Sequence, residues 1–258
     1  MIGSLVGSLS DVLRADTLLR RFCHLDRLTV IFPSRSHGVG SELMDEPRTA
    51  IVLAGGDPVN PDVIEDLPHD GFNVAADSGL DQALALGLEV DLIVGDMDSV
   101  SADALAAYRE TAVELHPRDK DHTDLELALR AAVRMGVDRI VIVGGAGGRL
   151  DHFLANALLI SSAEFSDLDV EWLTGDARLH VVHGTARLHC TPGNHVSLLA
   201  VHGPARGIHT EGFRWELEDE ELLPGATRGV SNVFEQPVAT VRVGEGTLLA
   251  IMTADLSV

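Results

Sequence analysis

The sequence predicts an α/β fold: an N-terminal, doubly wound, mostly parallel sheet domain, followed by a C-terminal all-β, sandwich-like domain. From about residue 50 to residue 173, short apolar runs alternate with helical stretches, which is the pattern of βαβ units. After Gly175 the helical periodicity ends, and short β-rich runs are separated by glycine and proline turns. A hydrophobic fraction of 45% is ample for a core, and 258 residues allow one large domain or two small ones.

The composition of the chain divides it into three segments. We expect the α/β domain over residues 44–177 and the β domain over residues 178–258. Residues 1–43 carry a net charge of +1, whereas the remainder carries −22. We therefore expect residues 1–43 to be a leader, either a disordered arm or the product of a mis-set translation start, with Met44 as the natural first residue.

The elements of the α/β domain follow from apolar runs and their breakers. Thr123 followed by Glu126 is a capping box, so a helix begins at Thr123 and Gly136 ends it. The expected strands are 50–53, 72–76, 92–94, 112–116, 139–143 and 170–173. The expected helices are 61–67, a helix closing at Leu86, 101–110, 123–135 and a helix that ends near Ser162.

The C-terminal half contains short β-rich runs between turns such as Pro192-Gly193 and Gly203-Pro204. The expected strands are 179–183, 186–190, 195–201, 208–211, 238–243 and 247–252. Several short strands at this spacing indicate a small sandwich or barrel.

Composition excludes several classes of function. The net charge is −21, and Lys120 is the only lysine beside 18 arginines. A surface this acidic argues against nucleic-acid binding, which needs a basic face, and against anionic membranes. It suits a protein adapted to high salt, although an acidic mesophilic protein has the same signature. Two cysteines fit neither a disulfide framework nor a metal motif, and no apolar run has the length of a membrane span, so we expect a cytoplasmic protein.

Asp96 and Asp98 end the apolar run Leu92-Ile93-Val94, at the carboxyl end of a buried strand. Residues two apart in extended backbone point to the same side, and open α/β sheets bind ligands at this edge. Two carboxylates there suit Mg²⁺. The spacing alone is weak, because chance gives about two Asp-x-Asp triplets in a chain with this aspartate content.

Further polar groups follow the other strands. Asp77, Ser78 and Gly79 come after the second strand, Asp121 and Asp124 flank the start of a helix, and residues 144–148 form a glycine-rich turn before Arg149 and Asp151. Glycines and helix N-termini suit phosphate. The turn matches neither a Walker A motif nor a dinucleotide fingerprint. The negative charge of Asp121 either stabilises the N-terminus of the helix or provides a third carboxylate ligand to the metal.

The β-rich half offers two further motifs. Trp215 lies within residues 210–217, and Ser231-Asn232 within residues 228–232. For a lone tryptophan in a β domain a place in the core is the simpler interpretation, and Ser231-Asn232 can form a turn.

Six motifs in this order resemble the thiamine pyrophosphokinase family. They are A-D-S-G at 76–79, D-L-I-V-G-D-M-D-S at 91–99, D-K-D-H-T-D at 119–124, G-G-R-L-D-H at 147–152, T-E-G-F-R-W-E-L at 210–217 and G-V-S-N at 229–232. The resemblance runs from about residue 50 to the C-terminus. Ser78 departs from it, since the family commonly has glycine there.

The resemblance implies an enzyme that transfers diphosphate from ATP to the hydroxyl of thiamine and releases AMP. It implies a homodimer, with thiamine bound across the interface. Carried over to this sequence, Asp96, Asp98 and Asp121 would hold Mg²⁺. Asp77, Ser78, Gly79, Thr123, Asp124 and Arg149 would bind the nucleotide, and Asp151, Trp215, Ser231 and Asn232 would bind thiamine.

Two other functions stay open at this point. One is a related ATP-dependent pyrophosphokinase that acts on a hydroxymethyl-dihydropterin, against which the β-rich half with Trp215 argues. The other is a non-catalytic nucleotide or thiamine sensor, against which the three candidate metal carboxylates argue.

Overall fold

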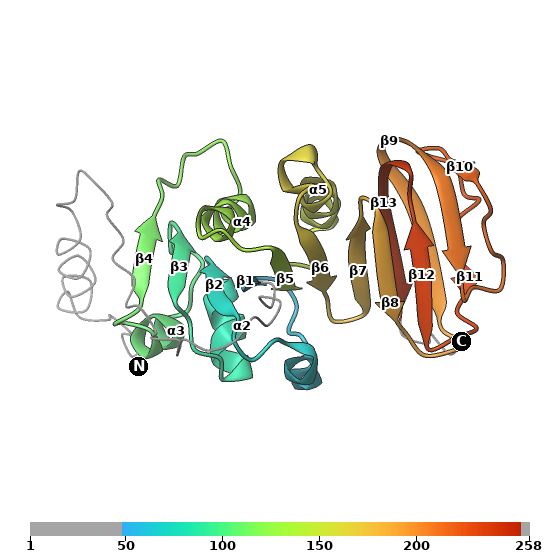
Figure 1. Ribbon diagram of the computed structural model, residues 1–258. Helices are drawn as coiled ribbons and strands as arrows, with labels where there is room; N and C mark the ends of the chain where they lie inside the picture. Colours follow the sequence, from blue (N-terminus) through green and yellow to red (C-terminus); the bar gives the residue numbers. More distant parts are fainter. Residues whose placement is uncertain (1–47, 254–258) are drawn as a thin grey trace, which may run out of the picture. The chain divides into compact units, whose positions relative to one another are not determined.

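The structure, a computed structural model, describes residues 48–253, and the expected leader at residues 1–43 lies outside this range. The first half is a mostly parallel sheet in the order β4-β3-β2-β1-β5-β6-β7 (Figure 1). Its strands are β1 (Thr49–Ala54), β2 (Phe72–Ala76), β3 (Leu92–Gly95), β4 (Ala112–Leu115), β5 (Arg139–Gly144), β6 (Asp169–Leu173) and β7 (Ala177–Val182). Only the pairing of β7 with β6 is antiparallel in this run.

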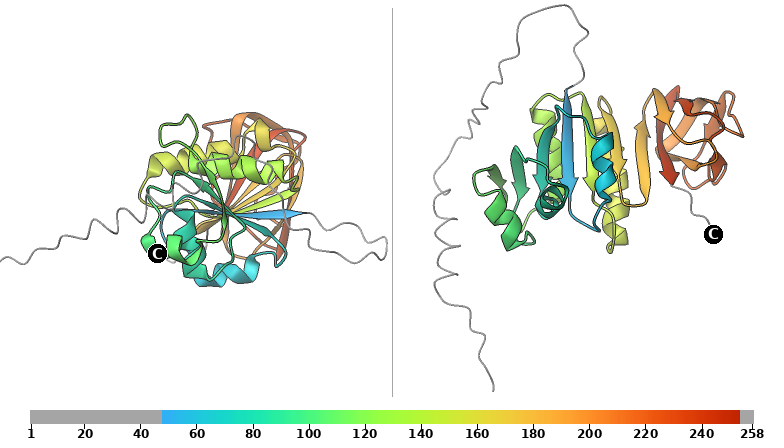
Figure 2. Two further views of the ribbon diagram at one scale, coloured as in Figure 1. Left: turned by 90° about the vertical axis from the view of Figure 1, so that its left-hand side faces the viewer. Right: turned by 90° about the horizontal axis from the view of Figure 1, so that it is seen from below.

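Helices cover both faces of this sheet, as the doubly wound prediction requires (Figures 1 and 2). One face carries η1 (Pro61–Asp66), α2 (Gly79–Leu86) and α3 (Ala102–Ala107). The opposite face carries α4 (Asp124–Arg134) and α5 (Leu150–Ile160), with the short η2 (Ala163–Phe165) after it. Seen from the β4 edge, the strands of the sheet fan out in a twist between the two helical layers (left view of Figure 2).

Successive side chains of the central strands point to opposite faces of the sheet, so each strand packs against both helical layers. In β1, Val52 and Ala54 pack under α4 and α5, whereas Ile51 and Leu53 pack under α2 and α3. A parallel strand buried on both faces reads as a continuous apolar run, which is why these strands could be recognised from the sequence. The sheet therefore holds its strand ends, and the loops after them, in fixed positions along one edge.

The second half is built from β strands around a separate apolar cluster. Its strands are β8 (Thr185–His189), β9 (His195–Glu211), β10 (Glu220–Leu222), β11 (Asn232–Val233), β12 (Val238–Arg242) and β13 (Glu245–Thr253). The first part of β9 pairs with β13, and its last part pairs with β12. Leu188 and Val241 from β8 and β12 meet Leu198 and Leu248 from β9 and β13 in the cluster, so two layers face each other.

Most expected elements are confirmed, with one correction in the β half. The strands expected at 195–201 and 208–211 are one element, β9, which continues through the expected turn. His202 and Gly203 have φ of 63° and 159°, so the strand bends at the start of the predicted turn Gly203-Pro204 without ending there. The sequence did not predict β10 and β11. The domain limit at residues 177/178 stays a prediction, because β7 pairs with β6 on one side and β13 on the other.

A buried carboxylate links three neighbouring strands at one side of the first half of the chain. Glu171 on β6 has a side chain only 7% exposed, and it contacts Arg139 Nη2 at 2.7 Å, His180 Nε2 at 3.2 Å and Arg178 Nε at 3.3 Å. Burial opposes the charge, but His180 and the two guanidinium groups outweigh it and lower the pKa of Glu171 from 4.5 to about 2. The contact set is thus a charged tie between β5, β6 and β7.

We expect Glu171→Gln to lower the free energy of unfolding by about 3 kcal/mol at pH 7, because it leaves the half-buried guanidinium groups of Arg139 and Arg178 without their shared carboxylate. A carboxyl with a lowered pKa stabilises the fold above its ordinary pKa, and this contribution is lost as the pH falls. The difference between the two proteins should therefore shrink from pH 4.5 to about 2. Urea denaturation at each pH measures this difference in the free energy of unfolding.

Glu164→Gln, which breaks a surface pair with Arg130, is the control and should lower the free energy of unfolding by less than about 1 kcal/mol. If Glu164→Gln and Glu171→Gln lowered it equally, the prediction would be contradicted.

Candidate active site

Three aspartates meet where β2 and β3 end. Asp77 follows β2, and Asp96 and Asp98 follow β3. One carboxylate oxygen of each lies within 4.8 Å of the others, a spacing that can hold one cation. Asp77 is buried, Asp96 is half-buried and Asp98 is exposed, so the cluster is open to solvent on the Asp98 side. We call these three residues the acid cluster.

The backbone at the acid cluster is in conformations that side chains rarely adopt. Asp77 has φ of 44° and Met97 has φ of 63°, both in the left-handed region, and Gly95 has φ of 148°. A Cβ on Gly95 would lie 3.0 Å from Asp124 Oδ1 and 3.1 Å from the Cβ of Asp77. Such conformations persist only where the surrounding structure imposes them, and they concentrate at functional sites.

The acid cluster fits a divalent cation. The carboxylate of Asp77 accepts a hydrogen bond from Ser99 Oγ on Oδ2, while its buried Oδ1 has no hydrogen-bond partner among the described residues. A buried oxygen without a partner is costly, and close carboxylates repel each other. A hard cation at this point would satisfy both, and oxygen ligands are what Mg²⁺ prefers.

Lys120 is a component of the site that the sequence reasoning did not assign. Its Nζ lies 3.1 Å from Asp96 Oδ2 and 2.9 Å from Asp124 Oδ1, and its side chain is only 13% exposed. Burial raises the pKa of Asp96, but the backbone N–H of Asp98 and the Lys120 ammonium lower it below its ordinary value. The signal was available, because the only lysine of the chain lies inside one of the recognised motifs.

Asp121 lies outside the acid cluster. It is exposed, and the structure groups Asp77 instead with Asp96 and Asp98. The metal role of Asp121 stays a prediction. Thr123 caps α4 as expected, since its Oγ1 accepts a hydrogen bond from the Glu126 N–H at 3.3 Å. Its neighbour Asp124 begins α4 and faces Lys120.

The loops after β1 and β5 pack on each other beside the acid cluster. Gly145 N–H donates to Gly55 O at 2.7 Å, and Asp57 N–H donates to Ala146 O at 2.8 Å. A Cβ on Gly147 would lie 2.1 Å from the carboxylate carbon of Asp57. The glycine-rich turn is therefore needed for close packing, and its predicted role in binding phosphate stays a prediction.

Ser78 and Gly79 begin α2 directly after Asp77. A Cβ on Gly79 would lie 2.0 Å from Leu53 O, so the helix start rests on β1 and only glycine fits. Ser78 stands next to Gly55, where a Cβ would lie 2.0 Å from the serine Oγ. These contacts fix the position of Asp77, and the nucleotide contacts of Ser78 and Gly79 stay a prediction.

Arg149 and Asp151, predicted to bind different substrates, contact each other. Arg149 Nε donates to Asp151 Oδ1 at 2.9 Å and Nη2 donates to Oδ2 at 2.6 Å. Both side chains are 65% exposed, and Arg149 lowers the pKa of Asp151 well below its ordinary value. The pair stands at the start of α5, and its two predicted roles are untested.

Trp215, Ser231 and Asn232 lie together in the β half. Asn232 Oδ1 accepts from Trp215 N at 3.2 Å, and its Nδ2 donates to Trp215 O at 2.7 Å. Asn232 is buried and holds the loop, while the Trp215 side chain is 59% exposed and Ser231 is exposed. The interpretation of Trp215 as a core residue is wrong, because the ring is free to contact a ligand or a partner.

The described helices include none that is long and apolar enough to cross a membrane.

Comparison with known proteins gives matches on both halves of the chain. The family model described as "Thiamin pyrophosphokinase, catalytic domain" matches residues 67–172 and thus contains the acid cluster. The model described as "Thiamin pyrophosphokinase, vitamin B1 binding domain" matches residues 179–248 and contains Trp215, Ser231 and Asn232.

Individual relatives agree with these matches. The thiamine pyrophosphokinase of Bacillus subtilis is 25% identical over 222 residues, which are 81% of this chain and 100% of the relative. Thiamine pyrophosphokinase 2 of Arabidopsis thaliana is 28% identical over 174 residues, 62% of this chain and 64% of the relative.

Solved structures show the same fold. The enzyme from Geobacillus thermodenitrificans aligns with a TM-score of 0.70 at 27% identity, covering 81% of this chain and 99% of the other. The enzyme from Bacillus subtilis aligns with a TM-score of 0.72 at 22% identity, covering 81% and 100%. With both family models matched in order across the α/β and β halves, this chain belongs to the thiamin pyrophosphokinase family.

Proposed function

We propose that this chain transfers the diphosphate of ATP to the hydroxyl of thiamine, giving thiamine diphosphate and AMP. The observation that carries the proposal is the acid cluster, which lies at the carboxyl ends of the strands within the segment matched as the catalytic domain. The match of residues 179–248 to a vitamin B1 binding domain supports thiamine as the acceptor.

Asp77, Asp96 and Asp98 would hold Mg²⁺, and Asp121 is the further candidate that the sequence motif adds. When bound, the ion supplies positive charge beside the phosphates of ATP, which these carboxylates would otherwise repel. Phosphoryl-type transfer depends mainly on positioning and on charge neutralisation. The residues of the chain would therefore act by fixing the phosphates and excluding alternative orientations.

The remaining predicted contacts divide between the two substrates. Ser78, Gly79, Thr123, Asp124 and Arg149 would contact the nucleotide, and Asp151, Trp215, Ser231 and Asn232 would contact thiamine. The exposed Trp215 ring can stack on a flat aromatic ligand, and Arg214 lies 5.7 Å from the ring centroid. Arg149 would have to exchange Asp151 for a phosphate, which is feasible because both are exposed.

We also propose a homodimer, and an apolar stripe on α5 supports it. Leu150, Leu154 and Leu158 follow a spacing of four residues on one helix face, and they are 71%, 56% and 50% exposed. An exposed row of this kind marks an interaction surface. Asp151 lies on the same helix, so an interface there would bring a predicted thiamine residue close to it.

Leu154→Glu should convert the dimer to a monomer, because a charge in the centre of an apolar contact would be desolvated without a partner. Sedimentation velocity measures the change, and Val133→Glu, at another exposed apolar residue, on α4 (40% exposed), is the control. A wild-type protein that sediments as a monomer, or a Leu154→Glu protein that stays dimeric, would contradict the proposal.

Location and partners complete the proposal. We propose a cytoplasmic enzyme whose partners are ATP, thiamine and a second copy of itself, with no nucleic-acid or membrane partner. The net charge of −21 supports the last two statements, since polyanions and anionic lipids would be repelled.

The test is incubation with Mg-ATP and thiamine in molar KCl, with chromatographic separation of the nucleotides. AMP that forms in step with thiamine diphosphate would support the proposal, whereas ADP would mean a simple kinase. AMP formed only with a pterin alcohol would change the acceptor. ATP binding without any turnover would favour a sensor.

A further inference from the structure

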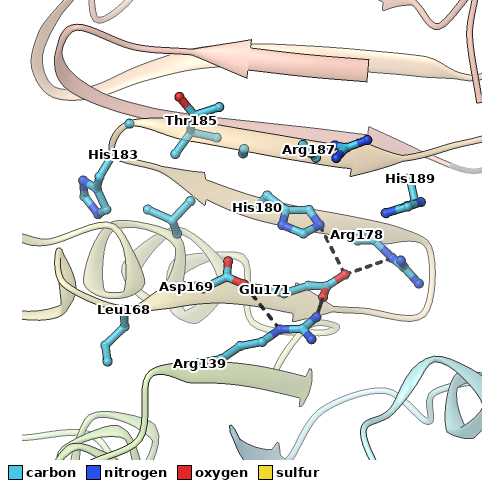
Figure 3. Close-up of a pocket in the computed structure, with 14 residues that line it drawn as sticks. Arg139, Leu168, Asp169, Glu171, Arg178, His180, His183, Thr185, Arg187 and His189 are labelled. Atoms are coloured by element: carbon cyan, nitrogen blue, oxygen red, sulfur yellow. Dashed lines mark hydrogen bonds and ion pairs between the residues drawn. The ribbon is translucent and has the colours of Figure 1, made fainter. Parts of the chain in front are cut away.

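A cavity of about 490 Å³ lies between β8 and the strands β5, β6 and β7 (Figure 3). No residue of the acid cluster lines it, and neither do Trp215, Ser231 and Asn232. Its volume falls in the range of small-molecule sites. Its charged walls carry Arg139, Arg178 and Arg187 with Asp169 and Glu171.

The cavity is basic although the chain is strongly acidic. Three arginines face two acids, and His180, His183 and His189 add further donors. On a chain with a net charge of −21, a concave site with excess positive charge is a local reversal of sign. Clefts lined by one sign of charge concentrate ions of the opposite sign.

Two of the arginines are already committed to acids. Arg139 and Arg178 both contact Glu171, as the dashed lines of Figure 3 mark. Arg178 also pairs with Asp66, and Arg139 Nε lies 3.4 Å from Asp169 Oδ2. These pairs account for the acids that line the cavity.

Donors are nevertheless left over. Arg187 has no acidic partner within residues 48–253, and it shares with Thr185 and His189 the side of β8 opposite the buried Leu188. His183 Nε2 is buried and makes no hydrogen bond within the described part of the chain, whereas Arg139 Nε makes no hydrogen bond but is held in the ion pair with Asp169. Arg187 on β8 and His183, directly after β7, thus line the same cavity with donors that are not taken up by its acids.

We propose that this cavity is a second binding site, for a small molecule that carries phosphate or diphosphate. A tetrahedral dianion presents oxygens in several directions, which suits donors from β8 and from the residue after β7, and a guanidinium binds such oxygens in pairs. Arg187 is the residue free to make the primary contact. The inference does not depend on the proposed function, because it rests on the lining of this cavity alone.

The test is calorimetric titration of the full chain in EDTA, with pyrophosphate, inorganic phosphate and AMP as separate probes. Without divalent ions the acid cluster repels phosphate, and an Asp96→Asn variant should bind the probes as well as wild type does. Wild type should bind one probe molecule per chain. Pyrophosphate as the tightest probe would indicate a diphosphate ligand, and AMP as the tightest a nucleotide.

Arg187→Ala should weaken this binding about tenfold, because it removes one charge-assisted contact. Arg242→Ala is the matched control: Arg242 is also exposed and without an acidic partner among the described residues, it lies beside Thr185 on β12, and it does not line the cavity. It should change the affinity less than twofold, and both variants should keep the urea midpoint of wild type.

An equal loss of probe affinity in Arg187→Ala and Arg242→Ala would overturn the proposal. So would the absence of saturable binding by wild type at millimolar probe concentrations. Conversion of a dimer to a monomer by Arg187→Ala, without phosphate binding by wild type, would also overturn it, because the cavity would then accept an acidic side chain of a second copy.

Discussion

Asp98→Ala should reduce the formation of AMP from ATP and thiamine on the order of 10³-fold or more, because it removes an oxygen ligand from the cation that neutralises the phosphates. The fold should tolerate the change. The side chain is 39% exposed, and its contact with Arg118 Nε, at 2.9 Å, is a surface pair of small energy. We expect the free energy of unfolding to change by less than about 1 kcal/mol, as urea denaturation would measure.

The control for Asp98→Ala is Asp103→Ala, which removes an exposed aspartate from the first turn of α3 and should leave the turnover unchanged. Asp121→Ala gives a third comparison. If Asp121→Ala loses as much turnover as Asp98→Ala, the result would support the metal-ligand role that the sequence motif predicts for Asp121. A small loss of turnover would favour Asp77, Asp96 and Asp98 as the metal ligands. Near wild-type turnover in Asp98→Ala itself would exclude the proposed role of the acid cluster.

The central strands of the sheet were predictable because they are buried on both faces. Continuous apolar runs such as residues 50–53 can hardly be placed elsewhere than in a parallel sheet between helices. β9 was not predictable to the same degree. Gly203-Pro204 looks like a turn in the sequence, and the chain does bend at His202 and Gly203. Whether the strand continues depends on β12 and β13, which follow far along the sequence and pair with its two ends.

The candidate site was predicted in its position but only partly in its composition. The edge of the sheet follows from the strand order, so Asp96 and Asp98 could be placed there from local pattern alone. Asp77 joins them because β2 and β3 are neighbours, a pairing that no local pattern reports. The contact of Arg149 with Asp151 depends on side-chain directions at a helix start, which the sequence does not specify.

The second large effect is expected when Lys120 is replaced. Lys120→Met should lower the free energy of unfolding by about 2 kcal/mol without Mg²⁺, because Asp96 and Asp124 would keep their charges in a largely buried place without a partner. Turnover should fall about 10-fold to 100-fold, since Lys120 contacts and orients two acids of the site. Lys120→Arg, which keeps the charge, should recover most of the stability. Thermal or urea unfolding with and without Mg²⁺ measures the effect.

The dependence of the stability loss of Lys120→Met on pH and on Mg²⁺ distinguishes a charge interaction of Lys120 from simple packing. The pKa of Lys120 is raised: burial opposes the charge, but Asp124 and Asp96 outweigh it. Its contribution is therefore complete below its ordinary pKa and is lost as the pH rises through the higher folded value. The pKa of Asp96 is lowered, so its contribution is complete above its ordinary pKa and is lost as the pH falls through the lower folded value.

The difference in stability between wild type and Lys120→Met should consequently be flat between about pH 5 and pH 9.5, and should decline on both sides of that window. A loss of packing alone would give the same difference at every pH. Mg²⁺ should narrow the difference, because a cation at Asp96 replaces part of the charge that the ammonium supplies. If Lys120→Met were equally destabilised with and without the ion, the lysine would stabilise the fold without sharing the carboxylates of the cation site.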